Sequence, residues 1–426
     1  MKNYRQRIAD SILERKLQTF GATLIVGPKG CGKTTTAKQY ANSVIEFQDE
    51  DNREKLLPVA NIMPSKLLIG DKPRLLDEWQ DAPKVWGAIR KDIDDSGLKG
   101  QYILTGSSSQ TVDTPHTGTL RISTMTMYPM SLYETGESSG EVSLSDLFDG
   151  KDVEWTESEL SVDELMHAIC RGGWPQSLDI VDTALSTDIA RDLFHQTCHA
   201  DISNINRAKR NPLWAEKLLQ SYARNICTLA ETKTIFADVT SSTNMSMPTF
   251  YEYFHDLEDL HIINEIPAWS PSIRSKASIR ASKKRNFVDP SIAVAALGVA
   301  PEYFNTDFKT LGFLFESLCL RDLTVYSSGL GGKLSYYHDR YGLEADCVLH
   351  LQDGRYALIE IKLGADEIDE GAEHLCEIER LVKEYNEKEK QTPLRLPDLK
   401  IVITGTQYGY KRDDGVLVIP IGCLKD

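Results

Sequence analysis

The sequence predicts an α/β protein of several domains, and three observations support this. The chain has 426 residues, which at ~150 residues per domain suggests two or three domains. Short apolar runs alternate with helix-like stretches in residues 1–133 and again in residues 285–426, a pattern typical of sheets with crossover helices. Between them, residues 162–265 carry apolar side chains at helical spacing and indicate a helical middle.

The first unit, residues 1–135, is predicted to be a parallel sheet flanked by helices. The expected strands cover residues 22–27, 74–78 and 101–106, and the expected helices cover residues 33–43 and 82–95. Strands that alternate with helices in this way pair in parallel through crossover connections.

An acidic segment follows this unit. Residues 134–164 hold eleven Asp or Glu residues, a single basic residue, Lys151, and a Gly/Ser-rich piece. Such a composition is typical of solvated chain. We therefore expect residues 136–161 to form an exposed acidic connector.

The middle is predicted to have two parts. Residues 162–225 are expected to form a helical, lid-like region, and residues 226–272 fit a winged helix-turn-helix. Its second helix would begin near Ser246, a plausible cap, and residues 260–267 would supply a wing strand. This helix carries several acidic residues, which argues against its entering a DNA groove. They are Glu252, Asp256, Glu258 and Asp259.

Residues 273–426 are predicted to form a second α/β unit. Expected strands cover residues 285–288, 346–351, 356–362 and 400–404, and expected helices cover residues 311–326 and 366–388.

Residues 27–34 read GPKGCGKT and match the phosphate-loop pattern GxxxxGK[ST] in full. The motif follows an expected strand and opens an expected helix, which is the context that supports it. Glycines let backbone N–H groups turn toward phosphate, Lys33 would neutralise the β- and γ-phosphates, and Thr34 would hold Mg²⁺. The sequence thus predicts ATP and Mg²⁺ as cofactors. The predicted cofactor-binding residues are Gly27, Pro28, Lys29, Gly30, Cys31, Gly32, Lys33, Thr34, Thr35 and Asp77.

Asp77 and Glu78 end the next expected strand and supply its acidic partner. Asp77 would bind Mg²⁺ through water, and Glu78 would polarise the attacking water as general base. Lys33 and Glu78 are therefore the predicted catalytic residues of this chain's own site.

Two further positions are predicted less specifically. Thr105 or Ser107, at the tip of another expected strand, could sense the γ-phosphate, and the sequence does not choose between them. Arg121 could act as an arginine finger on a neighbouring subunit's nucleotide, or could be an ordinary surface arginine.

The C-terminal unit contains a second group of charged residues. If the strands around Asp346 and Glu360 pair as a hairpin, the two carboxylates converge, and Lys362 shares a strand face with Glu360. Glu316, on an expected helix, could add a third carboxylate. Such a group can hold a divalent metal and activate water for phosphodiester cleavage. The alternative is a set of solvent-facing charges on an edge hairpin.

Smaller features leave alternatives open. Residues 274–285 carry six basic side chains in twelve positions and could neutralise DNA phosphates, or form a solvated loop. His195 and His199 lie one helical turn apart and could bind metal, although a structural pair is the expected role. Gly172–Pro175 is expected to form a tight packing turn, with a place near the nucleotide as the alternative.

Composition limits the class of protein. The net charge of −15 argues against a chain that coats nucleic acid. No apolar run reaches the ~18 residues of a membrane span, and the N-terminus does not read as a secretory signal. Eight scattered cysteines with no CxxC pair indicate reduced thiols. We expect a cytoplasmic protein.

As a set, several segments resemble bacterial and archaeal AAA-type ATPases fused to a C-terminal domain of unknown function with restriction-endonuclease-like character. The segments cover residues 27–35, 75–80, 88–108, 127–134, 171–175, 268–276, 287–291, 314–318 and 360–364. The resemblance implies a P-loop AAA-type core, a helical and winged-helix middle, and a PD-(D/E)xK-like end in which Glu316, Asp346, Glu360 and Lys362 form the nuclease-type site. Gly173–Pro175 is similar to a turn that contacts nucleotide phosphate in related signalling ATPases. Trp79 departs from the pattern, in which a smaller aliphatic residue is usual.

Three hypotheses follow from the sequence. The first is a Mg²⁺-dependent ATPase whose nucleotide state moves the middle and C-terminal parts. The second is an ATP-regulated DNA nuclease, and the third is an ATP-binding switch with little turnover that acts through protein partners. Residues 274–285 and the C-terminal domain would contact DNA, and the chain could form a homo-oligomer.

Overall fold

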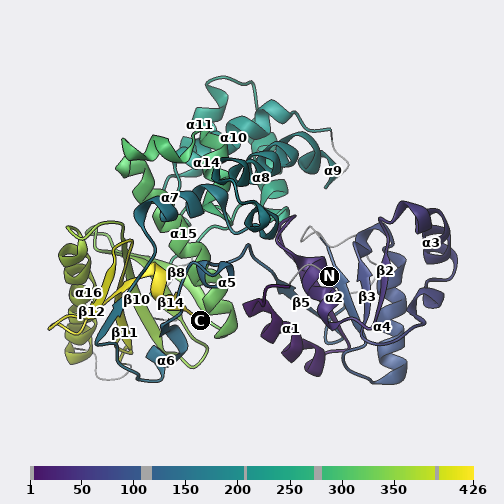
Figure 1. The fold of residues 1–426 in the computed structure, drawn as a ribbon, viewed down its shortest axis with the longest axis horizontal. Helices are drawn as coiled ribbons and strands as arrows, with labels where there is room; N and C mark the ends of the chain where they lie inside the picture. The colour runs from purple at the N-terminus through teal and green to yellow at the C-terminus, as the bar shows by residue number, and fades with distance from the viewer. Residues whose placement is uncertain (1–3, 107–117, 206–208, 273–280, 389–392) are drawn as a thin grey trace.

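The computed structural model describes residues 4–106, 118–205, 209–272, 281–388 and 393–426, which form three parts (Figure 1). A sheet with its helices lies at the N-terminal side, a group of helices forms the middle, and a second sheet forms the C-terminal side. The long helix α15 (Phe308–Gly329) lies between the parts and packs against α1 (Ile8–Thr19), so the first and last thirds of the chain are in contact.

The N-terminal part is a five-stranded parallel sheet in the order β2-β3-β4-β1-β5. Its central strands are buried along their full length, which explains why the sequence shows them as unbroken apolar runs. This confirms the predicted parallel α/β core. The strands are β1 (Ala22–Val26), β2 (Ser43–Glu46), β3 (Arg74–Asp77), β4 (Tyr102–Thr105) and β5 (Ile122–Thr126). Besides α1, the helices are α2 (Lys33–Tyr40), α3 (Glu50–Ile62), α4 (Lys84–Ser96), η1 (Pro64–Leu68) and η2 (Trp79–Asp81).

The acidic segment is not an exposed connector, as the sequence led us to expect. It forms α5 (Leu132–Thr135), β6 (Val142–Ser143), α6 (Leu144–Phe148) and β7 (Trp155–Glu157). Strand β6 pairs with β14 (Leu424–Lys425), and β7 pairs with β12 (Tyr408–Lys411) at the edge of the C-terminal sheet. The segment therefore belongs to the C-terminal part, where Figure 1 shows α6. Acidic residues such as Glu141, Asp149, Asp152 and Glu154 are exposed, whereas Glu134 and apolar residues such as Leu144 and Leu147 are buried.

The middle is helical, as predicted, but extends further along the chain than expected. Helix α14 (Pro290–Leu297) packs against α7, α8 and α10, so residues 290–297 belong here and not to a C-terminal unit beginning at residue 273. The helices are α7 (Val162–Arg171), η3 (Pro175–Asp179), α8 (Thr183–Gln196), η4 (Thr197–Asp201), α9 (Ile202–Asn204), α10 (Pro212–Arg224), α11 (Thr232–Thr240), α12 (Met247–Asp259), α14 and η5 (Pro301–Asn305).

Helix α12 begins at the predicted cap, because the Ser246 side chain accepts a hydrogen bond from the Thr249 N–H. After it, two isolated antiparallel bridges join Ile263 to Phe287 and Ile266 to Lys284. We call this paired segment the bridge ribbon. Three helices followed by a ribbon are compatible with a winged helix, which stays a prediction.

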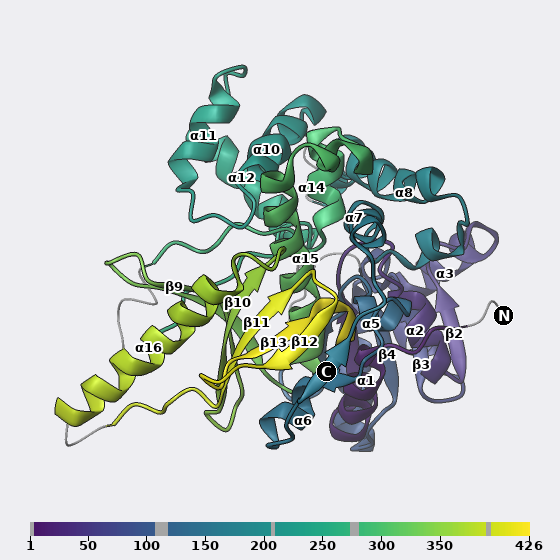
Figure 2. The ribbon, with the colours of Figure 1, turned by 60° about the vertical axis from the view of Figure 1, so that its left-hand side comes forward.

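The C-terminal part is a seven-stranded mixed sheet in the order β7-β12-β13-β11-β10-β9-β8. Side chains alternate along β10: Ala357, Ile359 and Ile361 join the core that contains α15, and Tyr356 and Leu358 join the core that contains α16. One long helix therefore covers each face, as Figure 2 shows for α16. The remaining elements are β8 (Lys333–His338), β9 (Glu344–His350), β10 (Tyr356–Lys362), α16 (Ile368–Lys388), β11 (Leu399–Thr404), β13 (Leu417–Pro420) and η6 (Ile421–Cys423).

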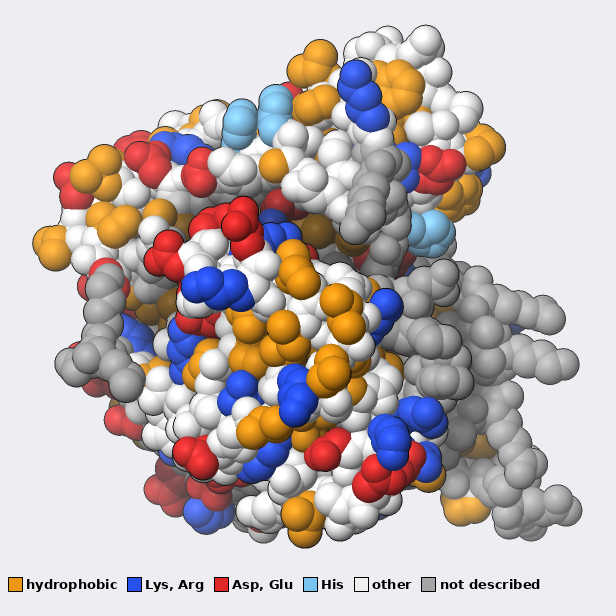
Figure 3. All heavy atoms as spheres, turned by 90° about the vertical axis from the view of Figure 1, so that its right-hand side faces the viewer, with side chains coloured by type: hydrophobic (Ala, Val, Ile, Leu, Met, Phe, Trp, Pro, Cys, Tyr) orange, Lys and Arg blue, Asp and Glu red, His pale blue; other side chains and the backbone are white. Residues whose placement is uncertain are grey.

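Surface and thiol features complete the description. Figure 3 shows hydrophobic side chains gathered on one face of the N-terminal part, with Lys and Arg among them. The exposed apolar residues of this part include Val59, Ile62, Met63 and Ile69, on and after α3. All eight cysteines are unpaired, as expected. A search of the described helices for one long and apolar enough to cross a bilayer finds none.

Candidate nucleotide-binding site

The phosphate loop joins β1 to α2 and is closely fitted to the strand beside it. Gly27 has φ 148°, and a Cβ placed there would lie 2.1 Å from the Met127 carbonyl oxygen. Gly30 and Gly32 also have positive φ values, of 79° and 103°, a conformation that glycine adopts without strain. The loop thus keeps the backbone shape that a phosphate cradle needs.

Lys33 opens α2, where its side chain is buried in the loop. Its Nζ donates to the carbonyl oxygens of Gly27 and Pro28, both at 2.9 Å. The ammonium is therefore held inside the curve of the loop, at the amino end of a helix, which is where phosphate groups bind.

Asp77 lies at the carboxyl end of β3, facing the start of α2. Its Oδ1 accepts hydrogen bonds from Thr34 Oγ1 at 2.7 Å and from Thr105 Oγ1 at 2.5 Å. Parallel strands β3 and β4 bring these residues to one sheet edge. A carboxylate beside a hydroxyl is an oxygen donor set that suits Mg²⁺. Thr105 is thus engaged with the acid; Ser107 lies outside the described residues.

Glu78 follows directly and is held by its backbone. It has a left-handed φ of 54°, which is uncommon for a residue other than glycine. Its N–H donates to Thr105 Oγ1 at 3.1 Å, and Gln80 Nε2 donates to Glu78 Oε2 at 2.5 Å. Burial raises the pKa of Glu78 above its ordinary 4.5, while the Gln80 hydrogen bond and the Lys33 charge lower it.

The N-terminal residues support the loop from behind, and the sequence analysis missed them. Arg7 donates from Nη1 to the Cys31 carbonyl and from Nη2 to the Tyr128 carbonyl, both at 2.8 Å, and its Nε lies 3.1 Å from Glu134 Oε1. Arg7 is 5 % exposed. No local motif marks this residue, because its partners lie 24 and 121 positions away.

The helical middle covers the other side of the loop. Lys29 Nζ lies 2.5 Å from Asp201 Oδ1 in η4. Lys29 and Gly30 line a pocket of about 260 Å³ together with Trp174, Gln176, Ile189, Asp192, Leu193, Gln196 and Asp201. The pocket therefore lies between the phosphate loop and the lid-like helices.

The turn at Gly172–Pro175 sits against the loop and the core at once. The Gly173 carbonyl accepts from the Met130 N–H at 2.7 Å, and a Cβ on Gly173 would lie 2.0 Å from the Met130 oxygen. An added Cβ on Gly30 would meet the Trp174 ring at 3.9 Å, and one on Gly32 would meet Pro175 at 3.6 Å. A packing turn and a place near the nucleotide were the alternatives predicted from the sequence. The turn packs tightly and also lies beside the phosphate loop.

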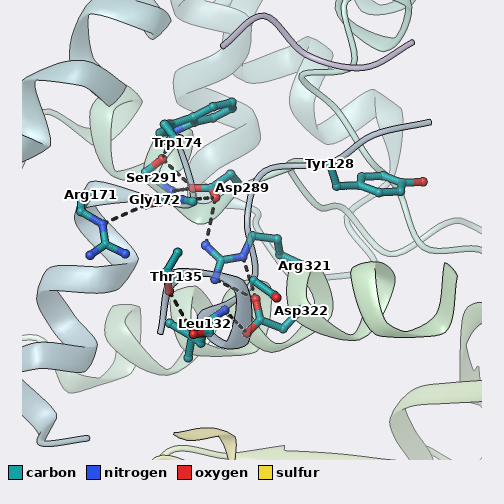
Figure 4. Close-up of polar contacts among 12 residues, drawn as sticks. Tyr128, Leu132, Thr135, Arg171, Gly172, Trp174, Asp289, Ser291, Arg321 and Asp322 are labelled. Atoms are coloured by element: carbon teal, nitrogen blue, oxygen red, sulfur yellow. Dashed lines mark hydrogen bonds and ion pairs between the residues drawn. The ribbon is translucent and has the colours of Figure 1, made fainter. Parts of the chain in front are cut away.

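A buried network continues from this turn (Figure 4). Asp289 Oδ2 accepts from the Gly173 N–H at 2.9 Å and from Arg321 Nη1 at 3.0 Å, and Trp174 Nε1 donates to Ser291 Oγ at 2.9 Å. Arg321 Nη2 lies 2.7 Å from Asp322 Oδ1. The network links the turn beside the phosphate loop to α15.

His261 is a second residue that the sequence analysis missed. It follows α12 with a left-handed φ of 57°, and its Nε2 is buried with no hydrogen-bond partner among the described residues. Burial and, next, the charge of Lys33 lower the pKa of His261 to about 4. The middle thus brings a neutral imidazole toward the phosphate loop.

Arg121 does not join this site. It precedes β5, whose residue Ile122 pairs with Ala22 at the amino end of β1, whereas the phosphate loop follows the carboxyl end. Its Nε donates to Asp94 Oδ1 at 2.7 Å within the same part. Action on a neighbouring subunit stays a prediction.

In the C-terminal part, the predicted residues do converge. The register of β9 and β10 pairs Cys347 with Ile359, so Asp346 and Glu360 lie at the end of this pairing, where the Ile361 N–H donates to Asp346 Oδ2 at 3.0 Å. Lys362 Nζ lies 2.8 Å from Glu360 Oε2. Glu316, on α15, joins Asp346 through the ammonium of Lys284, which lies 2.6 Å from Glu316 Oε1 and 3.2 Å from Asp346 Oδ1.

Burial shifts the ionisation of this cluster. It raises the pKa of Glu360 to about 9 and that of Glu316 to about 7. Lys284 and Lys362 outweigh burial at Asp346 and lower its pKa. The cluster is not the solvent-facing hairpin considered as the alternative, because Glu360 is fully buried and Asp346 is 8 % exposed.

The predicted metal at Asp346 and Glu360 stays a prediction: it would compete with the partners of Asp346, although both buried oxygens of Glu360 have no hydrogen-bond partner among the described residues. Asp346 Oδ1 contacts Lys284, and Oδ2 accepts from the Ile361 N–H at 3.0 Å, so both oxygens are engaged. Across the described residues, no three His, Cys, Asp or Glu side chains are arranged to hold a metal ion. His195 and His199 stack at 4.0 Å, and His199 pairs with Glu216, in keeping with a structural pair.

The basic strip is only partly available for phosphates. Residues 274–280 lie outside the described residues, but Lys283, Lys284 and Arg285 all pair with acids of this chain. Lys284 and Arg285 are 6 % and 5 % exposed. Lys284 and Arg285 are therefore internal and pair with largely buried carboxylates, whereas Lys283 is exposed.

Comparisons with known proteins match three consecutive ranges of the chain. Residues 19–136 match a family model described as an AAA domain, and residues 162–303 and 311–424 match two domains of unknown function, DUF8612 and DUF4143. The N-terminal part is therefore a P-loop domain of the AAA type. The second range includes α14. None of the curated proteins matches the chain.

The solved structures that are similar to the chain include two at 14% sequence identity. One is a Walker-type ATPase of Pyrococcus abyssi, with a TM-score of 0.43 over 69% of this chain and 96% of that chain. The other is a signal transduction ATPase with numerous domains (STAND), with a tetratricopeptide repeat sensor, from Pyrococcus horikoshii. Its TM-score is 0.25 over 77% of this chain and 48% of that chain.

Proposed function

We propose that this chain binds ATP with Mg²⁺ and hydrolyses it at the edge formed by the phosphate loop, β3 and β4. The observation that carries the proposal is the contact of Asp77 with the hydroxyls of Thr34 and Thr105, directly beside a half-buried Glu78. An acid that touches the phosphate-loop threonine is the arrangement that P-loop hydrolases use.

Each residue of the proposed site has a separate role in ATP binding or hydrolysis. Loop N–H groups and Lys33 bind the phosphates, with the Lys33 ammonium exchanging its loop carbonyls for phosphate oxygens. Thr34 and Asp77 would hold Mg²⁺, which supplies charge neutralisation for the transferred phosphoryl group. Glu78 accepts the proton of the attacking water, and its raised pKa brings it closer to the neutral range in which a general base works best.

The test is steady-state ATP hydrolysis with matched variants. We expect Glu78→Gln to keep ATP binding and lose about 10²–10⁴-fold in kcat, the usual contribution of a general base. Lys33→Ala should lose ATP binding. Glu54→Gln, at an exposed glutamate of α3 in the same part, should match the unchanged protein. Equal turnover in Glu78→Gln and the unchanged protein would refute the assignment of the base.

We also propose that the nucleotide state is passed to the helical middle. The support is the ion pair of Lys29 with Asp201 and the packing of the Gly172–Pro175 turn on the loop. Any movement of the loop on nucleotide binding would alter both contacts. Hydrogen exchange in residues 197–204 should then differ with ATP and ADP, and Asp201→Asn should reduce the difference. Asp188→Asn, at an exposed residue of α8, is the control.

A regulatory switch with little turnover is the alternative within the same site. It predicts tight nucleotide binding, nucleotide-dependent exchange in residues 197–204, and turnover that Glu78→Gln does not change. Both forms of the proposal include binding to partner proteins or DNA, self-association and a cytoplasmic location as further predictions. Sedimentation with and without ATP tests the self-association.

An ATP-regulated nuclease is the remaining candidate, and one observation favours it. Asp346 and Glu360 each adjoin the last paired residues of β9 and β10, Cys347 and Ile359, and Lys362 lies beside Glu360, which is compatible with the arrangement expected of a metal-dependent nuclease. The ammonium of Lys284 between Glu316 and Asp346 counts against it, because a metal would need the same oxygens.

A further inference from the structure

Lys284 enters the C-terminal cluster from another part of the molecule. It lies in the bridge ribbon, where its N–H donates to the Ile266 carbonyl at 2.9 Å and its carbonyl accepts from the Ile266 N–H at 3.0 Å. Its side chain leaves the ribbon and ends between α15 and β9. The ammonium therefore crosses from the helical middle to the C-terminal sheet.

The contacts of this ammonium are those of a buried cation. Nζ lies 2.6 Å from Glu316 Oε1, 3.2 Å from Asp346 Oδ1 and 3.2 Å from the Asp346 carbonyl oxygen. The side chain of Lys284 is 7 % exposed, and those of Glu316 and Asp346 are 12 % and 11 % exposed. Three oxygens from two elements of the C-terminal part thus surround one positive charge that is largely shielded from water.

A divalent metal in this cluster would need the same oxygens. Both carboxylate oxygens of Asp346 already have a partner, because Oδ1 lies 3.2 Å from Lys284 Nζ and Oδ2 accepts from the Ile361 N–H at 3.0 Å. Glu360 is paired with Lys362 at 2.8 Å, and His374 Nδ1 lies 3.7 Å from its other oxygen. A metal bound to the Glu316 and Asp346 oxygens that Lys284 contacts would have to replace its ammonium, because two cations on the same buried oxygens repel each other strongly.

We infer that Lys284 is the resident cation of this cluster: it holds Glu316 and Asp346 in place of a divalent metal and ties the bridge ribbon to the C-terminal sheet. The inference goes beyond the proposed ATPase and does not depend on it. The acid cluster is then an ion-paired contact between two parts of the chain, and it does not bind Mg²⁺ or Mn²⁺.

The experiment measures Mn²⁺ binding to the full chain without nucleotide, by the loss of the free Mn²⁺ signal in electron paramagnetic resonance. Every protein carries Asp77→Asn, so that Mn²⁺ binding at the proposed nucleotide site is weakened equally in all of them. Four proteins are compared: this reference, and the reference with Asp346→Asn, with Lys284→Met, or with both changes. Methionine keeps the length and apolar stem of lysine and removes its charge.

We expect the reference and its Asp346→Asn form to bind Mn²⁺ equally weakly. Lys284→Met should gain one Mn²⁺ per chain, bound at least tenfold more tightly than in the reference, and the added Asp346→Asn should abolish the gain. Lys284→Arg, which keeps the positive charge, should bind like the reference.

Two results would overturn the inference. One is Mn²⁺ binding by the reference that Asp346→Asn removes, since the cluster would then accept metal with Lys284 in place. The other is a folded Lys284→Met protein that gains no Asp346-dependent site. The first comparison changes nothing at Lys284, so it decides whether metal is excluded even if Lys284→Met does not fold.

Discussion

At the scale of single residues, Gly27 is the position where the phosphate loop has least freedom. It combines a φ of 148° with an approach of 2.1 Å between an added Cβ and the Met127 oxygen. Gly27→Ala therefore has to move either the loop or β5. We expect a loss of about 1–3 kcal/mol in stability, the usual cost of a strained backbone position, and a loss of ATP affinity measured by calorimetry.

Gly87, within α4, is the matched control. A Cβ placed there meets no atom of the described residues within 4 Å, and alanine in a helix interior is favoured over glycine by roughly 0.5–1 kcal/mol. Gly87→Ala should be neutral or stabilising and should bind ATP normally. If both variants behave alike, the loop geometry at Gly27 is not what limits binding.

Gln80 offers a way to test the ionisation of Glu78. Glu78 must be ionised to accept a proton, so kcat should rise with pH through its pKa, and burial moves that rise above the ordinary 4.5. The Gln80 hydrogen bond lowers this pKa, because it stabilises the carboxylate. Gln80→Ala should therefore move the acid limb of the pH profile to higher pH.

The measurement is kcat from pH 5 to 9 for both proteins. Gln18→Ala, at an exposed residue of α1, should leave the profile unchanged. A Gln80→Ala limb that moves to lower pH, or that stays in place, would contradict the role given to Gln80.

At the scale of elements, β7 shows why composition misled the sequence analysis. The strand has three residues, and its pairing partner β12 lies about 250 positions later in the chain. Its charged neighbours face water, so the segment has the composition of a connector. Only its pairing with a distant strand distinguishes a sheet strand from an exposed connector, and no local sequence pattern indicates that pairing.

The pairing register gives a matched test of β7. Hydrogen-bonded and non-hydrogen-bonded positions alternate in antiparallel pairs, and the Ser158 N–H donates to the Gln407 carbonyl at 2.8 Å. Thr156, opposite Gly409, is therefore a hydrogen-bonded position, and Glu157, opposite Tyr408, is not.

We expect Thr156→Pro to cost at least about 1–3 kcal/mol more than Glu157→Pro, because only the first leaves a buried carbonyl without its donor, and it also removes the hydrogen bond from the Thr156 hydroxyl to Glu141. Denaturant unfolding of the two full-length proteins measures the difference. Equal costs would mean that β7 contributes no ladder hydrogen bond to the C-terminal sheet.

The two candidate sites differ in how far the sequence predicts them. The phosphate loop is contiguous, so its residues and the flanking strand and helix are visible in one short segment. Asp346 and Glu360 were also predictable, because a hairpin register brings them together. Lys284 was not, since its segment reads as a basic strip. The apolar residues Phe287 and Val288 just after it were the one available sign that the strip enters a core.

Arg7 and His261 were missed for the same physical reason. Arg7 contacts the phosphate loop, and the charge of Lys33 lowers the pKa of His261, only because the tertiary fold brings the start of α1 and the end of α12 to this part of the molecule. Residues that support a site from a distance carry no spacing pattern of their own, unlike the ligands of a contiguous loop.

At the scale of the whole molecule, Arg321 joins the parts of the chain. It is fully buried and pairs with Asp289, at the start of α14, and with Asp322, on α15. Asp289 in turn holds the turn at Gly173, and Asp322 Oδ2 accepts from the Leu132 N–H at 3.0 Å, where the chain leaves the N-terminal part. The Arg321 guanidinium thus neutralises two carboxylates. These carboxylates contact the Gly173 turn, the start of α14 and the segment around Leu132.

Arg321→Met keeps much of the side-chain volume but leaves both carboxylates buried without a cation. Breaking a buried pair in this way costs about 3–5 kcal/mol, and here the loss should reach all three parts, because each is attached to the network. We expect unfolding at a lower denaturant concentration, together with weaker ATP binding, since the Gly172–Pro175 turn would lose its anchor beside the phosphate loop.

Arg380→Met is the control, because Arg380 pairs with Glu377 and Glu384 on the exposed face of α16. An exposed pair contributes little, so this variant should unfold and bind ATP as the unchanged protein does. Loss of stability in Arg321→Met with ATP affinity unchanged would mean that the network supports the fold without positioning the turn. Loss of both, with Arg380→Met unaffected, would place the turn, the phosphate loop and α15 in one cooperative unit.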